Sequence, residues 1–303
     1  MKREYQKIFW RVGQEVTPNT FTEADNYITA QQNLIRKIIN RQYFGLIPVS
    51  EANKLSLSIN AALRDMDVIV ERLSCQAVTK DGYLIDFNNN QLAAVRQRRI
   101  SLAALPAGSC YVVLRVKPFE QLLLPVENEE TPFALPVYEL DVKDISHIER
   151  DELPVMKINK KTQQPFIDWN YIPPCMAVRS HERLIEHFRS LQKMLVEILK
   201  LIHIKKAQLG QLVYPVTTLL FDLEQFSPSE PPFYLIQLLK KIVKIIGLYL
   251  PEVQKYSEAV LKAPYNHYDI TGVLHALMKC FQDIKSIIAK EEIIEVQDFT
   301  PKI

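Results

Sequence analysis

The residues best suited to chemistry in this chain lie in one short stretch, Pro264–Asp269, which reads PYNHYD. It holds His267 and Asp269, and Cys280 follows on the next predicted helix, so the residue types of a nucleophile, a base and an orienting carboxylate are present. The simpler interpretation is a Pro-Tyr turn with Asp269 as a helix N-cap and Cys280 packed inside a bundle. No oxyanion hole or nucleophile elbow can be written from the sequence, which therefore favours the simpler interpretation and predicts no enzyme.

The histidines and cysteines are spaced too widely to predict a metal site. His181 and His187 are six residues apart and His267 and His275 are eight apart, so neither pair has the i, i+4 spacing of a helical zinc site. The cysteines form no C-x-x-C pair. They stand at positions 75, 110, 175 and 280. We therefore expect no metal, no cofactor and buried free thiols.

Composition excludes two further classes of function. Only 7 of the 303 residues are glycine, and the closest two, Gly247 and Gly272, are too far apart for a Walker loop or a dinucleotide fingerprint. The formal net charge of +2 does not imply a nucleic acid partner. The one dense basic cluster, Arg96, Arg98 and Arg99, fits a solvated loop or a contact to an acidic protein. We expect neither a nucleic acid nor a small-molecule substrate.

Charged residues also argue against a membrane span and an acid–base pair. The segment FYLIQLLKKIVKIIGLYL carries Lys240, Lys241 and Lys244 at its centre, and three ammonium groups in hydrocarbon are too costly. This lysine face suits the solvated side of a bundle helix better than a membrane surface. Glu129 and Glu130 have no second acidic pair near them, so they predict no general acid–base dyad. Charges throughout MKREYQKIFWRVG leave no secretory signal, and we expect a cytoplasmic protein.

The first half of the chain is predicted to be mostly β-structure. From Lys54 the apolar residues alternate with a period of two, as in strands with one buried face. Asp81 and Gly82 stand between two alternating runs, which is a good hairpin signal. A helical pattern beginning at Thr20 precedes the strands. Residues 1–172 are therefore predicted to form an antiparallel β-sandwich with one early helix.

The second half is predicted to be a four-helix bundle. Two of its helical segments carry apolar seams with alternating spacings of four and three, which is typical of helices packed in bundles. The seams are Leu184, Phe188, Leu191, Leu195, Ile198 and Ile202, then Ile270, Leu274, Leu277, Phe281, Ile284 and Ile288. Two apolar segments lie between them, one with Pro215 near its expected start. Residues 173–303 are thus predicted to form a helical domain, and the chain as a whole has the α+β class.

Three short motifs resemble one protein family. Trp10-x-x-Gly13 followed by Pro18-x-x-Phe21 resembles the N-terminal signature of TssK, the trimeric baseplate protein of type VI secretion systems. YIPPCMAVRSHERL, at 171–184, is similar to that family's junction between a β-sandwich shoulder and a helical neck. The stretch at 263–269 is similar to the Pro-Tyr-x-His-x-Asp turn before the last neck helix. The order and spacing of the motifs agree along nearly the whole chain.

The resemblance implies a structural adaptor without turnover. It implies a homotrimer whose shoulder binds the TssF–TssG wedge of the baseplate, with Trp10, Gly13, Pro18 and Phe21 as the contact, and with the two seams serving the bundle or the trimer. Family members usually continue into a head that docks the membrane complex, whereas this sequence ends at Ile303, just past the last predicted neck helix. Baseplate binding is therefore the role expected here, at the inner face of the inner membrane, with a membrane-complex protein as a further partner.

Two other functions stay open from the sequence alone. A phage-tail-like receptor-binding or fibre-connecting protein would have the same architecture facing outward. A small hydrolase would use His267, Asp269 and Cys280. The baseplate adaptor is ranked first because the three motifs agree in order and spacing with that family, and the hydrolase is ranked last because the residues suited to catalysis have a simpler structural interpretation.

Overall fold

The computed structural model describes residues 7–8, 10–13, 15–39, 43–48, 55–87, 95–96, 98–124, 133–161 and 164–290. These residues fall into two compact units. One contains Met1–Glu182 together with His267–Asp269, and the other contains Arg183–Asn266 and Ile270–Ile303. The domain boundary after Ile172 stays a prediction.

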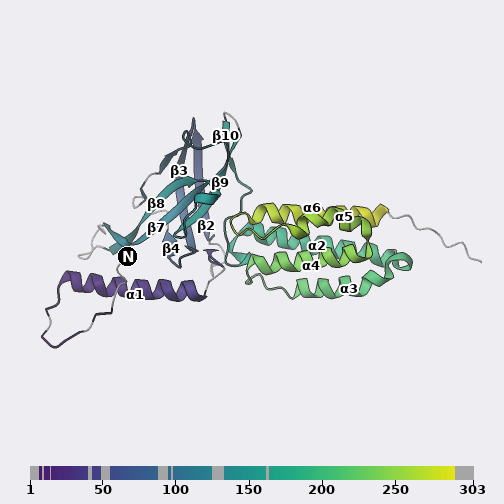
Figure 1. The fold of residues 1–303 in the computed structure, drawn as a ribbon, viewed down its shortest axis with the longest axis horizontal. Coiled ribbons are helices and arrows are strands. Elements are labelled where there is room, and N and C mark those ends of the chain that lie inside the picture. The colour runs from purple at the N-terminus through teal and green to yellow at the C-terminus, as the bar shows by residue number, and fades with distance from the viewer. Residues whose placement is uncertain are drawn as a thin grey trace, which may run out of the picture. The chain divides into compact units, whose positions relative to one another are not determined.

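The first unit contains one long helix and two five-stranded sheets (Figure 1). In one sheet β3 is central and pairs antiparallel with all four of its neighbours. Its strands are β1 (Gly45–Leu46), β2 (Leu57–Arg64), β3 (Asp67–Val78), β4 (Leu84–Phe87) and β6 (Arg99–Ser101). The other sheet has the order β10-β9-β7-β8-β5, from β5 (Val95–Arg96), β7 (Gly108–Leu124), β8 (Phe133–Lys143), β9 (Glu152–Lys161) and β10 (Gln164–Asp168). Its pairs are antiparallel except β5 with β8, which is parallel.

The alternating sequence of β3 accounts for the packing of the two sheets. Every second residue in much of this strand is buried, including Val68 and Val70, so one face of the sheet is apolar. Facing it, the buried ring of Tyr138 on β8 lies 5.0 Å from the ring of Phe87 on β4, nearly edge-on. The Tyr138 hydroxyl donates to the Asp86 carbonyl at 3.3 Å. The predicted β-sandwich is therefore present, and the α+β class is confirmed.

The predicted hairpin at Asp81 and Gly82 is confirmed and supports the early helix. The Gly82 amide donates to the Thr79 carbonyl, and β3 and β4 pair directly on either side of the turn. Gly82 has a φ of +87°, a region that favours glycine. The helix α1 (Pro18–Ile39) crosses this turn so closely that a Cβ on Gly82 would lie 2.4 Å from the Asn33 carbonyl oxygen.

The described residues of the second unit form five helices, whereas the sequence predicted four (Figure 1). They are α2 (Glu182–Ile204), α3 (Lys206–Glu224), α4 (Pro232–Tyr249), α5 (Pro251–Lys262) and α6 (Ile270–Lys290). The additional helix is α5, which begins with a proline at its first position, where no amide is needed.

The predicted start of one helix near Pro215 is wrong, because α3 begins at Lys206 and contains this proline in its interior. Proline there removes one helical hydrogen bond. The hydroxyls of Thr217 and Thr218 donate to the Val213 and Tyr214 carbonyls in the same turn, at 2.7 and 3.1 Å, and add bonds to the backbone around it.

Substitution of Gly82 by alanine tests whether α1 rests on the hairpin. We expect Gly82→Ala to lower the free energy of unfolding in urea more than Gly13→Ala does. Both glycines have positive φ, at +87° and +79°, so both variants share a strain of about 1–2 kcal/mol. Only Gly82 faces backbone atoms, while Gly13 has nothing within 4 Å, so overpacking should add roughly 1–3 kcal/mol at Gly82 alone. Equal losses would contradict this contact.

Candidate functional site

The helix α1 presents an apolar face that its own chain leaves exposed. Within its 22 residues, all of which the structure describes, Asn33 is the one buried residue. Phe21, Ile28 and Ile35 follow one another at intervals of seven, which places them on one side of the helix, and each is at least half exposed. Ile38 and Ile39 continue the exposed apolar surface. A contiguous exposed apolar face of this kind is typical of a protein–protein contact.

Local sequence fixes where α1 begins. Thr17 precedes the helix, and its hydroxyl accepts from the Thr20 amide at 3.3 Å while the Thr20 hydroxyl accepts from the Thr17 amide at 3.2 Å. This reciprocal pair is the threonine version of a capping box. Pro18 occupies the first helical position, where its missing amide costs nothing. The start of α1, and with it the position of Phe21, is thus encoded locally.

The structure describes all four residues of the N-terminal motif. Trp10 is 51% exposed and Phe21 is 60% exposed. Gly13 has a φ of +79° in open space, and Pro18 starts α1. Their contact with a baseplate protein stays a prediction.

All twelve seam residues are buried within the single chain. Each is at most 5% exposed, and Phe188 is the most exposed of them. They lie on α2 and α6, where Leu184, Leu195, Ile270 and Ile288 are completely or almost completely enclosed. The seam side chains are therefore occupied in packing the second unit.

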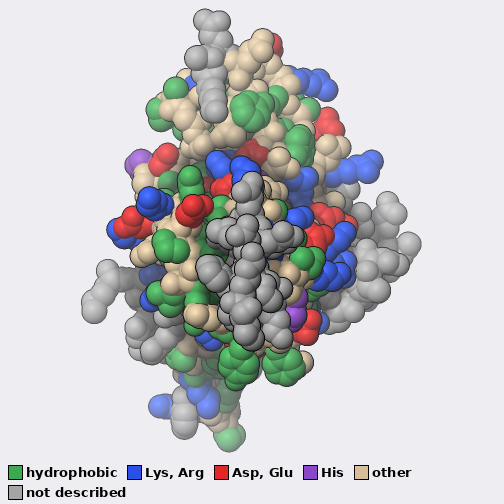
Figure 2. All heavy atoms as spheres, turned by 90° about the vertical axis from the view of Figure 1, so that its right-hand side faces the viewer, with side chains coloured by type: hydrophobic (Ala, Val, Ile, Leu, Met, Phe, Trp, Pro, Cys, Tyr) green, Lys and Arg blue, Asp and Glu red, His purple; other side chains and the backbone are tan. Residues whose placement is uncertain are grey.

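The charged residues singled out from the sequence do not form a single-sign surface. Arg99 pairs with Asp67 at 2.6 Å, and Lys241 lies 3.4 Å from Asp222. The Arg96 side chain, Glu129 and Glu130 lie outside what the structure describes. On the face drawn in Figure 2, basic and acidic side chains are interleaved.

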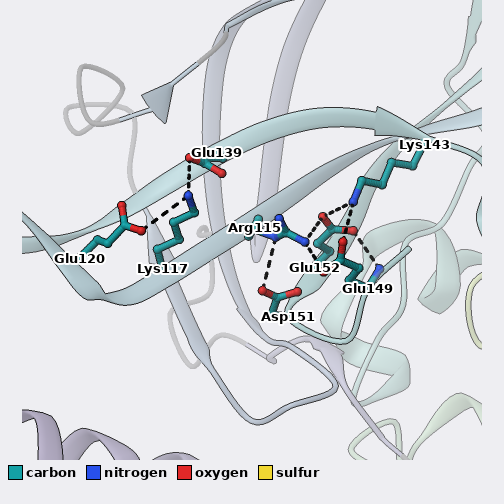
Figure 3. Close-up of polar contacts among 8 residues, drawn as sticks. All are labelled: Arg115, Lys117, Glu120, Glu139, Lys143, Glu149, Asp151 and Glu152. Atoms are coloured by element: carbon teal, nitrogen blue, oxygen red, sulfur yellow. Dashed lines mark hydrogen bonds and ion pairs between the residues drawn. The ribbon is translucent and has the colours of Figure 1, made fainter. Parts of the chain in front are cut away.

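A network of ion pairs crosses the sheet that contains β7, β8 and β9 (Figure 3). At its centre the Glu152 side chain is only 1% exposed. It forms an ion pair with Arg115 at 2.9 Å, and it accepts hydrogen bonds from Lys143 at 2.6 Å and from the Glu149 amide at 2.9 Å. Burying a carboxylate is unfavourable unless it is paired, and here two cations and an amide pair it. Glu152 thereby ties the loop between β8 and β9 to the sheet.

The outer members of the network are also paired. Arg115 contacts Glu149 at 2.5 Å and Asp151 at 3.3 Å, and Lys117 contacts Glu139 at 2.7 Å. The hydrogen bond from Arg115 holds the pKa of the Glu149 carboxyl below its usual value. The arrangement is therefore that of a structural network rather than of a general acid and its base. This ion-pair network was not predicted from the sequence. The one pattern that points to it is the spacing of two between Arg115 and Lys117, which places both side chains on one face of a strand.

His267 has a structural partner in the first unit. Its Nε2 lies 2.6 Å from the Phe44 carbonyl oxygen, and since a carbonyl can only accept, Nε2 is the donor. The ring also packs edge-on against Phe44, with centroids 4.6 Å apart. Burial lowers the pKa of His267 to about 4, although the bond to Phe44 opposes this shift.

The other two members of the candidate triad are also in structural roles. Asp269 immediately precedes α6, as predicted, and its carboxylate lies 3.5 Å from the Lys157 ammonium group. Cys280 is buried on α6, and burial raises the pKa of its thiol to about 11, so the thiol is protonated at neutral pH. His267 belongs to the first unit and Cys280 to the second. The hydrogen bond of His267 to a backbone carbonyl and the burial of the Cys280 thiol are typical of structural roles.

No metal site and no membrane span emerge from the described part of the chain. Its histidine, cysteine and acidic residues nowhere gather in groups of three or more that could hold an ion. Across the same residues, every helix is too short or too polar to cross a bilayer. His187 on α2 and His275 on α6 do approach each other, with ring centroids 5.5 Å apart, a pairing that their separation in sequence hides.

Comparison with known proteins gives a clear structural result. No protein-family model and no curated protein matches the sequence. A crystal structure of TssK has a TM-score of 0.62 with this chain, at 15% identity, over 93% of this chain and 70% of that one. The chain has the fold of TssK. A chain of the type VI secretion TssK-TssF-TssG baseplate subcomplex gives a TM-score of 0.61, at 15% identity, over 93% of this chain and 99% of that one.

A third structure extends the likeness to TssK. TssK from the EAEC type VI secretion system, in complex with a nanobody, has a TM-score of 0.58 at 15% identity, over 87% of this chain and 68% of that one. The matches to TssK cover 87% or more of a chain that consists of a long early helix, a β-sandwich and a helical unit, in that order. Two of the matched structures, the TssK-TssF-TssG subcomplex and a further complex, are baseplate complexes of the type VI secretion system.

Replacing His267 by glutamine tests its buried role through pH. The folded-state pKa of about 4 lies below the unfolded value near 6.5, so the neutral ring stabilises the fold above pH 6.5, and this stability is lost as the pH falls toward 4. Between pH 7 and pH 5 the loss from this group is about 2 kcal/mol. We expect urea unfolding of His267→Gln to be less pH-dependent by about this amount. His187 titrates in both proteins, so the difference isolates His267, and identical pH profiles would contradict its burial as a neutral donor.

Proposed function

We propose that this protein is a structural adaptor of a type VI secretion baseplate, without catalytic turnover. The observation that carries the proposal is the structural match to a chain of the TssK-TssF-TssG subcomplex, which extends over 93% of this chain. A match over 93% of the chain extends beyond the sandwich, which is a fold shared by many functions. The partners proposed are TssF and TssG, with a membrane-complex protein as a further one, at the cytoplasmic face of the inner membrane.

The proposed wedge contact is the N-terminal motif together with the apolar face of α1. Trp10 and Phe21 are large, aromatic and exposed, which are the properties of residues that dominate binding energy at interfaces. Ile28 and Ile35 extend the same face along the helix. The exposed row on α1 therefore offers a TssF–TssG wedge a ready helical contact.

The proposed oligomer is a homotrimer, and its contacts must use side chains outside the two seams. Seam residues that are enclosed within one chain have no surface to offer a second copy. On α3, Tyr214 is 80% exposed and Phe221 is 59% exposed, and their spacing of seven places them on one face. We assign the trimer contact to this face of α3.

Alanine at the aromatic residues of the N-terminal motif tests the wedge contact. We expect Trp10→Ala and Phe21→Ala each to weaken binding to purified TssF–TssG by roughly tenfold or more, as loss of an interface hot spot does. Trp169→Ala is the matched control, because Trp169 is 52% exposed against 51% for Trp10, and it should bind normally. Equally strong binding in all variants would contradict the assignment of Trp10 and Phe21 to the wedge contact.

Light scattering behind a sizing column tests the trimer. We expect a mass near three times the 35.1 kDa of one chain. Phe221→Glu should lower the mass toward a single chain, since a charge in a packed apolar contact is unfavourable. Leu248→Glu, at an exposed position of α4, should leave it unchanged. A single-chain mass for the unmodified protein would overturn the oligomer.

A further inference from the structure

A basic groove runs between α4 and α5 in the second unit. Its volume is about 850 Å³, and five lysines and one glutamate line it along with four uncharged residues. The charged residues are Lys240, Lys241, Lys244, Lys255, Lys262 and Glu258. The lysines outnumber the single glutamate, so the groove has a net positive charge, and a concave charged surface concentrates its field on whatever enters it.

Three of the five groove lysines have no acidic partner among the described residues. Lys262 is paired with Glu258 on the same helix, and Lys241 lies 3.4 Å from Asp222. Lys240 donates to the Leu261 and Ala263 carbonyls at the end of α5. Those bonds satisfy the Lys240 ammonium group but bring no negative charge. Lys244 and Lys255 are exposed and form no ion pair with a described residue. The groove therefore favours an acidic occupant.

The groove is also partly apolar. Pro251 and Leu261 contribute to its walls, and the methylene chains of the lysines cover apolar surface beside them. A free phosphate would use the charge and leave this surface uncovered. A peptide that alternates acidic and apolar side chains would use both.

The sequence contains such a segment immediately after α6. Residues 291–299 read EEIIEVQDF, with four acidic residues, four apolar ones and no basic residue. We propose that this segment binds in the lysine groove of the same chain, with its carboxylates directed to the α4 and α5 lysines. The inference goes beyond the proposed baseplate function and does not rest on it.

The place where α6 ends is compatible with this binding. Lys290, its last residue, lines a second hollow together with Glu252 and Tyr256 at the start of α5. Pro251 and Lys255 of the same two turns line the lysine groove on another face of α5. A helix is about 10–12 Å across, and nine extended residues reach about 30 Å. The segment is therefore long enough to pass α5 and lie along the groove.

Cross-linking in the intact chain tests the proposal. In Lys244→Cys/Glu295→Cys, mild oxidation should form an intramolecular disulfide at least tenfold faster than in the control Lys200→Cys/Glu295→Cys, because Lys200 is an exposed lysine on α2 outside the groove. The four native cysteines are buried, so they should not compete. Equal rates in the two pairs would overturn the proposal, and so would a rate that rises with protein concentration, which would indicate another copy as the occupant.

Reversing charges in the groove and in the segment tests whether the segment binds by electrostatic attraction or is cross-linked only because it lies nearby. Adding Lys255→Glu to the groove pair should slow its cross-linking several-fold, and adding Glu292→Lys as well should restore it. Lys255 is exposed and has no ion pair with a described residue, so circular dichroism should show that Lys255→Glu leaves the fold unchanged. Insensitivity to the reversal would exclude the groove as the binding site. Unchanged cross-linking in the Trp10→Ala background would show that the result is independent of baseplate binding.

Discussion

The first unit depends on a short stretch of backbone, Phe44–Leu46, that is hydrogen-bonded on several sides at once. Leu46 donates to the Pro174 carbonyl at 2.8 Å and accepts from the Met176 amide at 3.0 Å, while β1 pairs with β3. The Phe44 carbonyl meanwhile accepts from His267. Gly45 permits this crowding, because its φ is +116° and a Cβ would lie 2.1 Å from the Pro174 oxygen. Phe44–Leu46 thus holds together β3, the segment around Pro174 and the segment around His267, which are far apart in the sequence.

Features with a local signal were predictable from the sequence. The Asp81–Gly82 turn followed from residue preference at a positive φ, and the burial of Leu195 and Leu277 followed from the spacing of apolar residues on a helix. The position of Asp269 directly before α6 was likewise predictable from the residues next to it in the sequence. In each case the interaction that decides the structure lies within a few residues along the chain.

Features decided by distant residues were not predictable in the same way. Arg115 and Glu152 pair only because β7 and β9 are neighbours, and a single sequence does not show that register. The helix α5 has only 12 residues and is weakly apolar, with Val253 and Ser257 as its buried residues, so it lacks a long apolar seam like those of α2 and α6. The apolar residues of α1 posed another problem, because Ile28 reads as a core residue in sequence but is exposed in the folded chain. The spacing of apolar residues shows that a helix has an apolar face, but it does not show whether the same chain buries that face.

The contact between α1 and the sandwich restricts which residue can stand in the turn below the helix. Asn33, the one buried residue of α1, has its carbonyl oxygen over Gly82, and the ion pair of Lys37 with Asp81 is close by. An exposed ion pair contributes about 0–1 kcal/mol. The missing side chain of Gly82 therefore matters more than the charges, because a larger residue there would displace α1 and with it the exposed apolar face that the helix carries.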